Sequence, residues 1–149
     1  MRVVDIIAAA VAQVPEINEF LSSSKFILNY ESDNNRVFPV AYLDRPIRVN
    51  LITTAQGTFL ERYTVEILFA ELQERMTDSV QAQLIADTQI ETMRFVSEKF
   101  LTALQKDEQI EKIQSANYLD TTNFYDCGLN GVVLTLVFTL RVEFPYPCV

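Results

Sequence analysis

Carboxylates are the residues of this chain that come closest to forming a reactive site. They gather in four clusters: Glu16 with Glu19, Glu71 with Glu74, Asp107 with Glu108 and Glu111, and Asp120 with Asp126. Two carboxylates held close together can act as the acid and base of a hydrolase, or bind Mg²⁺. Each cluster lies in a polar stretch with no Gly-rich loop or second ligand set beside it. The pattern therefore favours solvated surface charge, and we expect no metal site.

Other reactive residue types are absent or isolated. The chain has no histidine, which removes the commonest general base at neutral pH and the commonest metal ligand. The serines at 22–24 have no base near them and are typical of a turn. No phosphate-binding glycine loop, dinucleotide-binding glycine motif, zinc-ligand spacing or esterase serine motif occurs. We therefore expect a protein that is not an enzyme and uses no cofactor.

The composition is that of one globular domain spanning residues 1–149. Of the 149 residues 49% are hydrophobic, and only 3 are glycine, so a full core can be buried. Twenty acidic residues against 12 basic ones give a formal charge of −8. A surface of this sign repels nucleic acid on average, so we expect no dedicated nucleic-acid binder.

The cysteines and the N-terminal residues indicate whether the protein is oxidised, exported or bound to a membrane. Cys127 and Cys148 lie at opposite ends of the last predicted strand, too far apart to bridge if that strand is straight, so we expect reduced thiols. Residues 1–14 resemble a short signal peptide, but Asp5 interrupts the apolar stretch and favours an ordinary helix. No apolar run is long enough to span a membrane, so we expect no membrane association.

The N-terminal half is predicted to contain helices followed by short strands. Apolar residues from Val3 to Val14 recur at helical spacing, and Pro15 is suited to open a second short helix that the serines at 22–24 end. Two apolar runs, Lys25–Glu31 and Arg36–Leu43, flank polar turn residues and predict a hairpin. Pro39 cannot donate to a ladder, which favours a sheet edge or a bulge for the second run. Ile47–Thr53 predicts another strand.

The C-terminal half contains the strongest patterns. Phe59–Leu72 alternates as a long, half-buried strand. Val80–Lys106 has no Gly or Pro, follows capping residues, and predicts a helix of roughly 40 Å. Its predicted buried stripe consists of Leu84, Ile85, Thr88, Thr92, Met93, Val96, Phe100, Leu101 and Leu104. Ile113–Asn123 predicts a strand that leads through a loop into the last strand, Val132–Phe144.

These elements predict an α+β fold, a mostly antiparallel β-sheet with the long α-helix and the N-terminal helices packed on one face. The last strand is the anomaly, because 13 residues in strand span about 43 Å, more than a domain of this size needs. Its second face carries Val133, Thr135, Val137 and Thr139. Either burial on both faces or an exposed edge offered to a neighbouring subunit would explain that composition.

The order of elements resembles a family of virion proteins. The stretches "VAYLDRP", "FLERYTVEILFAEL", "DTQIETMRFVSEKFLTAL" and "YDCGLNGVVLTLVFTLRVEFPYPC" follow the N-terminal helix in the order seen in tail terminator or tail completion proteins of tailed bacteriophages. The similarity is greatest to those of Bacteroides-infecting, crAss-like phages, in which an aromatic residue, an Asp and a later Gly precede a hydrophobic strand that ends in Pro and Cys. It covers nearly the whole chain.

The resemblance implies a structural, non-enzymatic virion protein of the tail or neck, assembled in the host bacterial cytoplasm. Its subunits would form a homo-oligomeric ring, a hexamer or a dodecamer, that docks onto portal-side or other neck and tail proteins. DNA would pass through the lumen without sequence-specific binding.

Within that family pattern two sets of residues are singled out. The loop before the last strand would be structural, with Phe124, Asp126, Gly128 and Gly131 matching the pattern. The subunit interface would include Val133, Val137, Phe144 and Tyr146. A different class of protein stays open beside this one, namely a small non-viral α+β adaptor or ligand-binding module with a pocket between helix and sheet.

Overall fold

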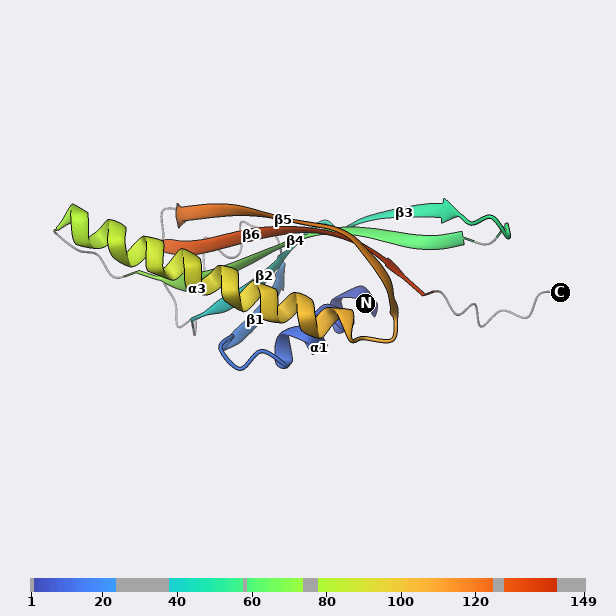
Figure 1. Cartoon of the computed structure of the whole chain (residues 1–149), viewed down its shortest axis with the longest axis horizontal. Helices are drawn as coiled ribbons and strands as arrows, with labels where there is room; N and C mark the ends of the chain where they lie inside the picture. Colours follow the sequence, from blue (N-terminus) through green and yellow to red (C-terminus); the bar gives the residue numbers. More distant parts are fainter. Residues whose placement is uncertain (1, 24–37, 58, 74–77, 125–127, 142–149) are drawn as a thin grey trace.

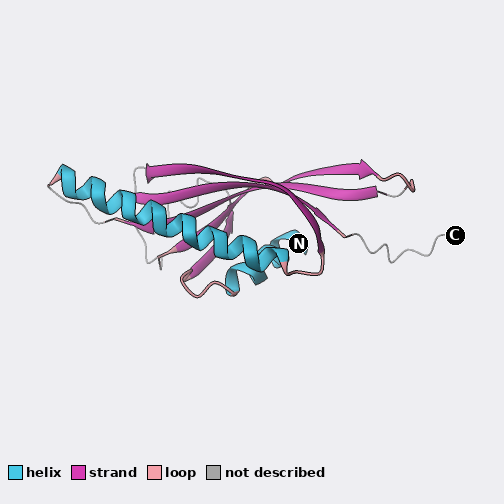
Figure 2. Cartoon of the chain, in the orientation of Figure 1, coloured by secondary structure: helices cyan, strands magenta, loops and turns pink. Residues whose placement is uncertain are grey.

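The computed structural model describes residues 2–23, 38–57, 59–73, 78–124 and 128–141. Their element order is α1 (Arg2–Ala12), β1 (Glu19–Ser23), β2 (Val40–Asp44), β3 (Arg48–Thr53), β4 (Phe59–Leu72), α3 (Ser79–Gln105), β5 (Ile110–Phe124) and β6 (Leu129–Leu140). The strands form one six-stranded mixed sheet with both helices packed against it (Figure 1, Figure 2), so the predicted α+β class is confirmed.

The sheet is antiparallel except for one pair of strands. Its order is β1-β2-β4-β6-β5, and β3 pairs with β4 beyond the end of β2. Only β1 and β2 run parallel. The strands β4 and β5 lie on either side of β6 and are both antiparallel to it, so they run in the same direction and α3 is the crossover between them. Of the three long strands, β4 and β6 thus lie inside the sheet and β5 forms one edge, and the long helix packs against their common core.

The helix α3 forms where the sequence predicts it. Asp78 is its N-cap, with a side-chain oxygen accepting from Val80 N and Gln81 N. The face of α3 that contacts the sheet is buried, and the centroid of the Phe100 ring there lies 5.4 Å from that of the Phe69 ring. The same core contains the inward residues of β6, namely Val132, Leu134, Leu136, Phe138 and Leu140.

The predicted buried stripe of α3 is wrong in the first half of the helix. Ala86 and Ile90 are buried there, whereas Leu84 and Ile85 are exposed. The reason is helical geometry: Leu84 precedes the buried Met93 by nine residues, which is about two and a half turns, and so lies on the opposite side. The contacts of the second half determine which side faces the sheet.

The N-terminal segment supplies one helix and one strand. Val3, Ile6, Ile7 and Ala10 bury the predicted face of α1 in the same core as α3. The second helix predicted after Pro15 is wrong, because Glu19–Ser23 forms β1 and pairs with β2 along its whole length. Backbone pairing with a neighbouring strand outweighs the local helical pattern there.

The strand β2 lies inside the sheet, between β1 and β4, and pairs with both in a continuous register, so neither the edge nor the bulge that Pro39 favoured occurs in it. Pro39 is compatible with this place because it precedes the strand, and its carbonyl accepts from Asn18 N at 2.9 Å. Val40 and Tyr42 pack with Leu68 in a second cluster, separate from the main core. The partner run Lys25–Glu31 lies outside the described residues.

The strand β6 is the centre of the sheet and not an edge. It pairs with β4 over twelve residues, from Leu129 to Leu140, and with β5 on its other side. Of the two explanations offered for its composition, the exposed edge is therefore wrong, and Val133 and Val137 on the second face are half-buried. The strand also begins earlier than predicted, at Leu129, and Arg141 is no longer part of it.

The start of β4 and the whole of β3 form a hairpin that projects from the body, here called the arm (residues 48–53 and 59–62). The pairing of β4 with β6 begins only at Glu61, so Phe59 pairs with β3 alone. Figure 1 shows the arm extending beyond the remaining strands, at the opposite end of the long axis from the start of α3. The outer part of the arm, where Ile52 and Thr53 pair with Leu60 and Phe59, is thus two-stranded and has no helix over it.

Candidate functional site

The carboxylate clusters do not form a reactive site among the described residues. Glu16 binds Lys99, whose hydrogen bond lowers the pKa of that carboxyl. Asp120 accepts from Arg94 at 2.6 Å, which links β5 to α3. In the part of the chain that the structure describes, no three His, Cys, Asp or Glu side chains are grouped so that they could hold a metal ion. Glu74 and Asp126 lie outside that part.

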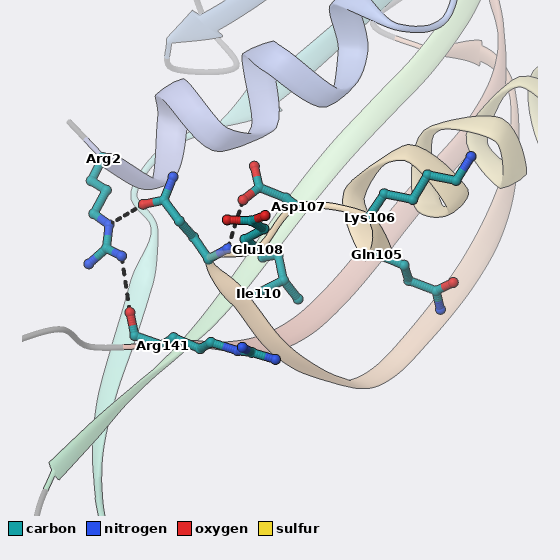
Figure 3. A pocket seen from close by; sticks show the side chains of 8 residues that line it. Arg2, Gln105, Lys106, Asp107, Glu108, Ile110 and Arg141 are labelled. Carbon is teal, nitrogen blue, oxygen red and sulfur yellow. Dashed lines mark hydrogen bonds between the residues drawn. The ribbon is translucent and has the colours of Figure 1, made fainter.

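An open, polar hollow of about 630 Å³ lies between the start of α1 and the turn after α3 (Figure 3). Arg2 crosses it, with Nε donating to Gln109 Oε1 at 2.8 Å and Nη2 donating to the Arg141 carbonyl at 3.0 Å. The Arg141 amide donates to the Gln109 carbonyl at 2.7 Å. These bonds connect the start of α1, the turn after α3 and the end of β6, so the residues around the hollow stabilise the fold. The lining offers no nucleophile with an adjacent base.

A tyrosine anchors the base of the arm. The ring of Tyr63 stacks on Phe138 at 5.8 Å, and its hydroxyl donates to Glu61 Oε2 at 2.5 Å. Burial raises the pKa of Tyr63 to about 12, and the Glu61 carboxylate adds to the rise. The hydroxyl therefore stays protonated at neutral pH and serves as a hydrogen-bond donor where the ribbon leaves the body.

The four residues of the predicted structural loop do not all lie in one loop. Gly128 has a φ of +72°, which favours glycine, and its carbonyl accepts from Gln73 N at 2.8 Å. Gly131 lies within β6 instead of in the loop, and a Cβ there would meet the Phe69 carbonyl oxygen at 1.8 Å. Phe124 is the last residue of β5, while Asp126 is outside the described residues. Gly128 thus permits a positive φ, and Gly131 permits the close approach of β4 to β6.

A buried amide network follows directly after this turn. Asn130 Nδ2 donates to Gln73 Oε1 at 2.6 Å and to Gln89 Oε1 at 2.8 Å. Gln73 and Gln89 in turn donate to backbone carbonyls of α3 and of the end of β4. Because Asn130 is almost wholly buried, these bonds satisfy polar atoms that water cannot reach. The network fixes the first half of α3 to the sheet.

The predicted interface residues fall into two groups. Val133 and Val137 lie on the face of the sheet that carries no helix, where Val133 packs against the second cluster. Phe144 and Tyr146 lie outside the described residues. The half-buried valines offer less free apolar surface than other parts of the chain.

Three exposed apolar side chains lie together on the arm, which was not predicted as an interaction surface. Val49, Leu51 and Phe59 are 43%, 67% and 50% exposed. The pairing register puts all three on the face that carries Tyr63. The signal in the sequence was the length of the strands. A strand of 14 residues is much longer than its partner of 6 residues, and one helix does not cover the apolar face of both, so part of that face is left exposed.

A second exposed apolar row runs along the outer side of α3. Val80, Leu84 and Phe95 are 68%, 62% and 57% exposed. Their spacings of four and eleven residues are close to whole turns, so they share one side of the helix. Among the described residues, no helix is both long enough and apolar enough to cross a membrane.

No protein-family model matches this chain, and no curated protein sequence does either.

Proposed function

We propose that this chain is the subunit of a homo-oligomeric ring in the virion of a tailed bacteriophage, a tail terminator or neck ring that joins the tail to the portal side. The observation that carries the proposal is the arm, whose apolar face is exposed on a ribbon projecting from an otherwise packed subunit. Exposed contiguous apolar surface is typical of protein interaction sites. The family resemblance gives this surface its role.

The shape of the subunit supports assembly over solitary function. The arm and the start of α3, where the outer row begins with Val80, lie at opposite ends of the long axis (Figure 1). A subunit with different contact surfaces at its two ends can associate head to tail, and a ring results when the rotation between subunits closes. A hexamer or a dodecamer is the expected ring, and portal-side and tail proteins are the expected partners.

The charge of the chain suits a lumen through which DNA slides. A formal charge of −8 per subunit repels the phosphate backbone on average, so passing DNA would not adhere. The role requires no catalysis, no cofactor and no sequence-specific base contacts. Assembly would take place in the host bacterial cytoplasm, and the ring would remain in the virion.

The test is the mass and shape of the assembled protein. Six subunits of 17.1 kDa give about 103 kDa and twelve give about 205 kDa, which size-exclusion chromatography with light scattering distinguishes from a monomer. Negative-stain microscopy should show rings, either of the protein alone or after addition of purified tails. A monomer at high concentration, with no ring alone or on tails, would refute the proposal.

Two further observations separate the proposal from the adaptor or ligand-binding alternative. A gene neighbourhood that contains portal and tail-tube genes is expected for a neck protein. A fixed dimer with no higher species, from a locus without virion genes, would instead favour a non-viral adaptor. The space between α3 and the sheet, where a ligand pocket was considered, is filled by buried side chains such as Phe100 and Leu136.

A further inference from the structure

We infer that the pair Asn130–Gly131 is a deamidation site that is protected while the sheet is intact and reacts once the chain unfolds. Asn130 is the one asparagine of the sequence that is followed by glycine. Asparagine is a thermolabile residue, and a following glycine has no Cβ to shield the backbone nitrogen that attacks the asparagine side chain. The inference concerns a single subunit and does not depend on the proposed ring.

The reaction needs only water and a mildly alkaline solution. The Gly131 backbone nitrogen loses its proton to hydroxide and bonds to the side-chain carbon Cγ of Asn130, and the amide nitrogen Nδ2 of Asn130 leaves as ammonia. The product is a five-membered succinimide ring. Water then opens the ring at either carbonyl, which gives aspartate or isoaspartate. Overall one water is consumed and one ammonia is released, with no oxidation or reduction.

The folded structure keeps the two reacting groups from meeting. Asn130 is almost wholly buried, and its Nδ2 donates to Gln73 Oε1 at 2.6 Å and to Gln89 Oε1 at 2.8 Å. Gly131 lies inside the sheet, paired with Ala70 of β4 on one side and with β5 on the other. Attack requires the Asn130 side chain to turn toward the Gly131 backbone, so both hydrogen bonds must break. The reaction is therefore confined to molecules in which the sheet has opened.

The product does not fit the site in which it would have to refold. The amide nitrogens of Gln73 and Gln89 donate to backbone carbonyls, which keeps their Oε1 atoms turned toward residue 130. An aspartate there would place a carboxylate, which has no donor, against two acceptor oxygens in a buried position. Glu71 is the cross-strand partner of this position on β4, and like charges directly opposite destabilise a strand pair. Isoaspartate would in addition lengthen the backbone of β6 by one carbon. Unfolding thus becomes irreversible at this residue.

The fold depends on both members of the labile pair. A Cβ at Gly131 would lie 1.8 Å from the Phe69 carbonyl oxygen, so the close approach of β4 to β6 requires glycine. Asn130 supplies the donor that Gln73 and Gln89 share. The same contacts that require this dipeptide also protect it in the folded state.

The first experiment measures deamidation in the folded and the unfolded full chain. The protein is held in mildly alkaline buffer with or without guanidinium chloride, and peptide mass spectrometry follows the replacement of NH by O at each asparagine. Asn50 and Asn117 are internal controls, because both are exposed in the folded protein but precede Leu51 and Tyr118. In denaturant Asn130 should react at least about tenfold faster than either control, because glycine alone lacks a shielding side chain. Without denaturant Asn130 should react at least about a hundredfold more slowly than with it, because only the rare open molecules react.

Two results of this experiment would overturn the inference. Equal rates at Asn130 with and without denaturant would show that the sheet gives no protection. Equal rates at Asn130 and at the two controls in denaturant would show that the pair is not a preferred site.

The second experiment tests the consequence for refolding. Wild-type protein held in denaturant for increasing times is diluted to refold, and the fraction that regains native circular dichroism should fall in step with the fraction of intact Asn130. The matched control is the same incubation in mildly acidic buffer, where hydroxide is scarce and refolding should be retained. Asn130→Asp should unfold at a lower denaturant concentration than Asn130→Ala at neutral pH, because only the aspartate adds a buried charge. Full refolding of deamidated chains, or an unfolding midpoint of Asn130→Asp at or above that of Asn130→Ala, would overturn the irreversibility.

Discussion

Replacement of Gly131 by Ala tests the closest backbone contact in the fold. A Cβ at this position would lie 1.8 Å from the Phe69 carbonyl oxygen and 2.9 Å from the Ala70 Cα. Both are backbone atoms of β4, directly across the ladder from Gly131. No rotation of a side chain relieves the overlap, so the two central strands must move apart.

The cost follows from the size of that movement. An ordinary contact of at least about 3 Å requires a separation of more than 1 Å, which breaks the adjacent hydrogen bonds of the ladder. Two lost bonds and the loosened packing of Phe69 together give a destabilisation of about 2–4 kcal/mol. For a chain of this length that corresponds to a fall in Tm of about 5–15 °C.

The other two glycines provide matched controls. Gly57, at the tip of the arm, has a φ of +78° and no atom near its added Cβ, so Gly57→Ala should cost only about 1–2 kcal/mol of left-handed strain. Gly128 has a φ of +72° and an added Cβ 2.9 Å from the Gln73 carbonyl, so Gly128→Ala should fall between the two. The expected order of damage is therefore Gly131, then Gly128, then Gly57.

The assay is urea unfolding followed by the circular dichroism of the helices, because the chain has no tryptophan. Dilute protein keeps assembly from contributing to the measured stability. If Gly131→Ala unfolds at the same urea concentration as Gly57→Ala, the close approach of β4 and β6 at this point is refuted.

Three further variants test other contacts. Asp78→Ala removes the N-cap of α3 and should lower the free energy of unfolding by about 1 kcal/mol in urea titrations, whereas an unchanged midpoint would contradict the cap. Glu71→Gln tests a carboxyl whose pKa is raised mainly by burial. A carboxyl whose pKa is raised by folding favours the folded state below its unfolded pKa, and this contribution is lost as the pH rises through its folded pKa. Glu71→Gln should therefore be more stable than wild type at neutral pH, by less than about 1 kcal/mol, and should lose this advantage in acid. A difference in stability between Glu71→Gln and wild type that stays constant across pH would refute the raised pKa of Glu71. Asn130→Ala leaves Gln73 and Gln89 without a shared donor and should cost about 2–3 kcal/mol, with faster hydrogen exchange in the first half of α3 than in the second; uniform exchange would show that the network does not fix that half.

Local patterns in the sequence were sufficient for the elements with a clear period. The strand Phe59–Leu72 has its predicted bounds, and α3 lies within one residue of its predicted ends. Alternation and helical spacing are properties of a single segment, and the capping aspartate acts on the backbone of its own helix. The α+β class follows from such elements because each has one apolar face to bury.

The tertiary structure decided which segments meet. The segment Glu19–Ser23 is a strand because β2 lies beside it, and β6 is central because β4 and β5 both pair with it. Neither partner can be read from the segment itself. The candidate site follows the same logic, since Leu51 and Leu84 look like ordinary core residues of a strand and a helix. They are exposed because the sheet is longer than the layer of helices at one end and because α3 turns its other side to the core at the other end.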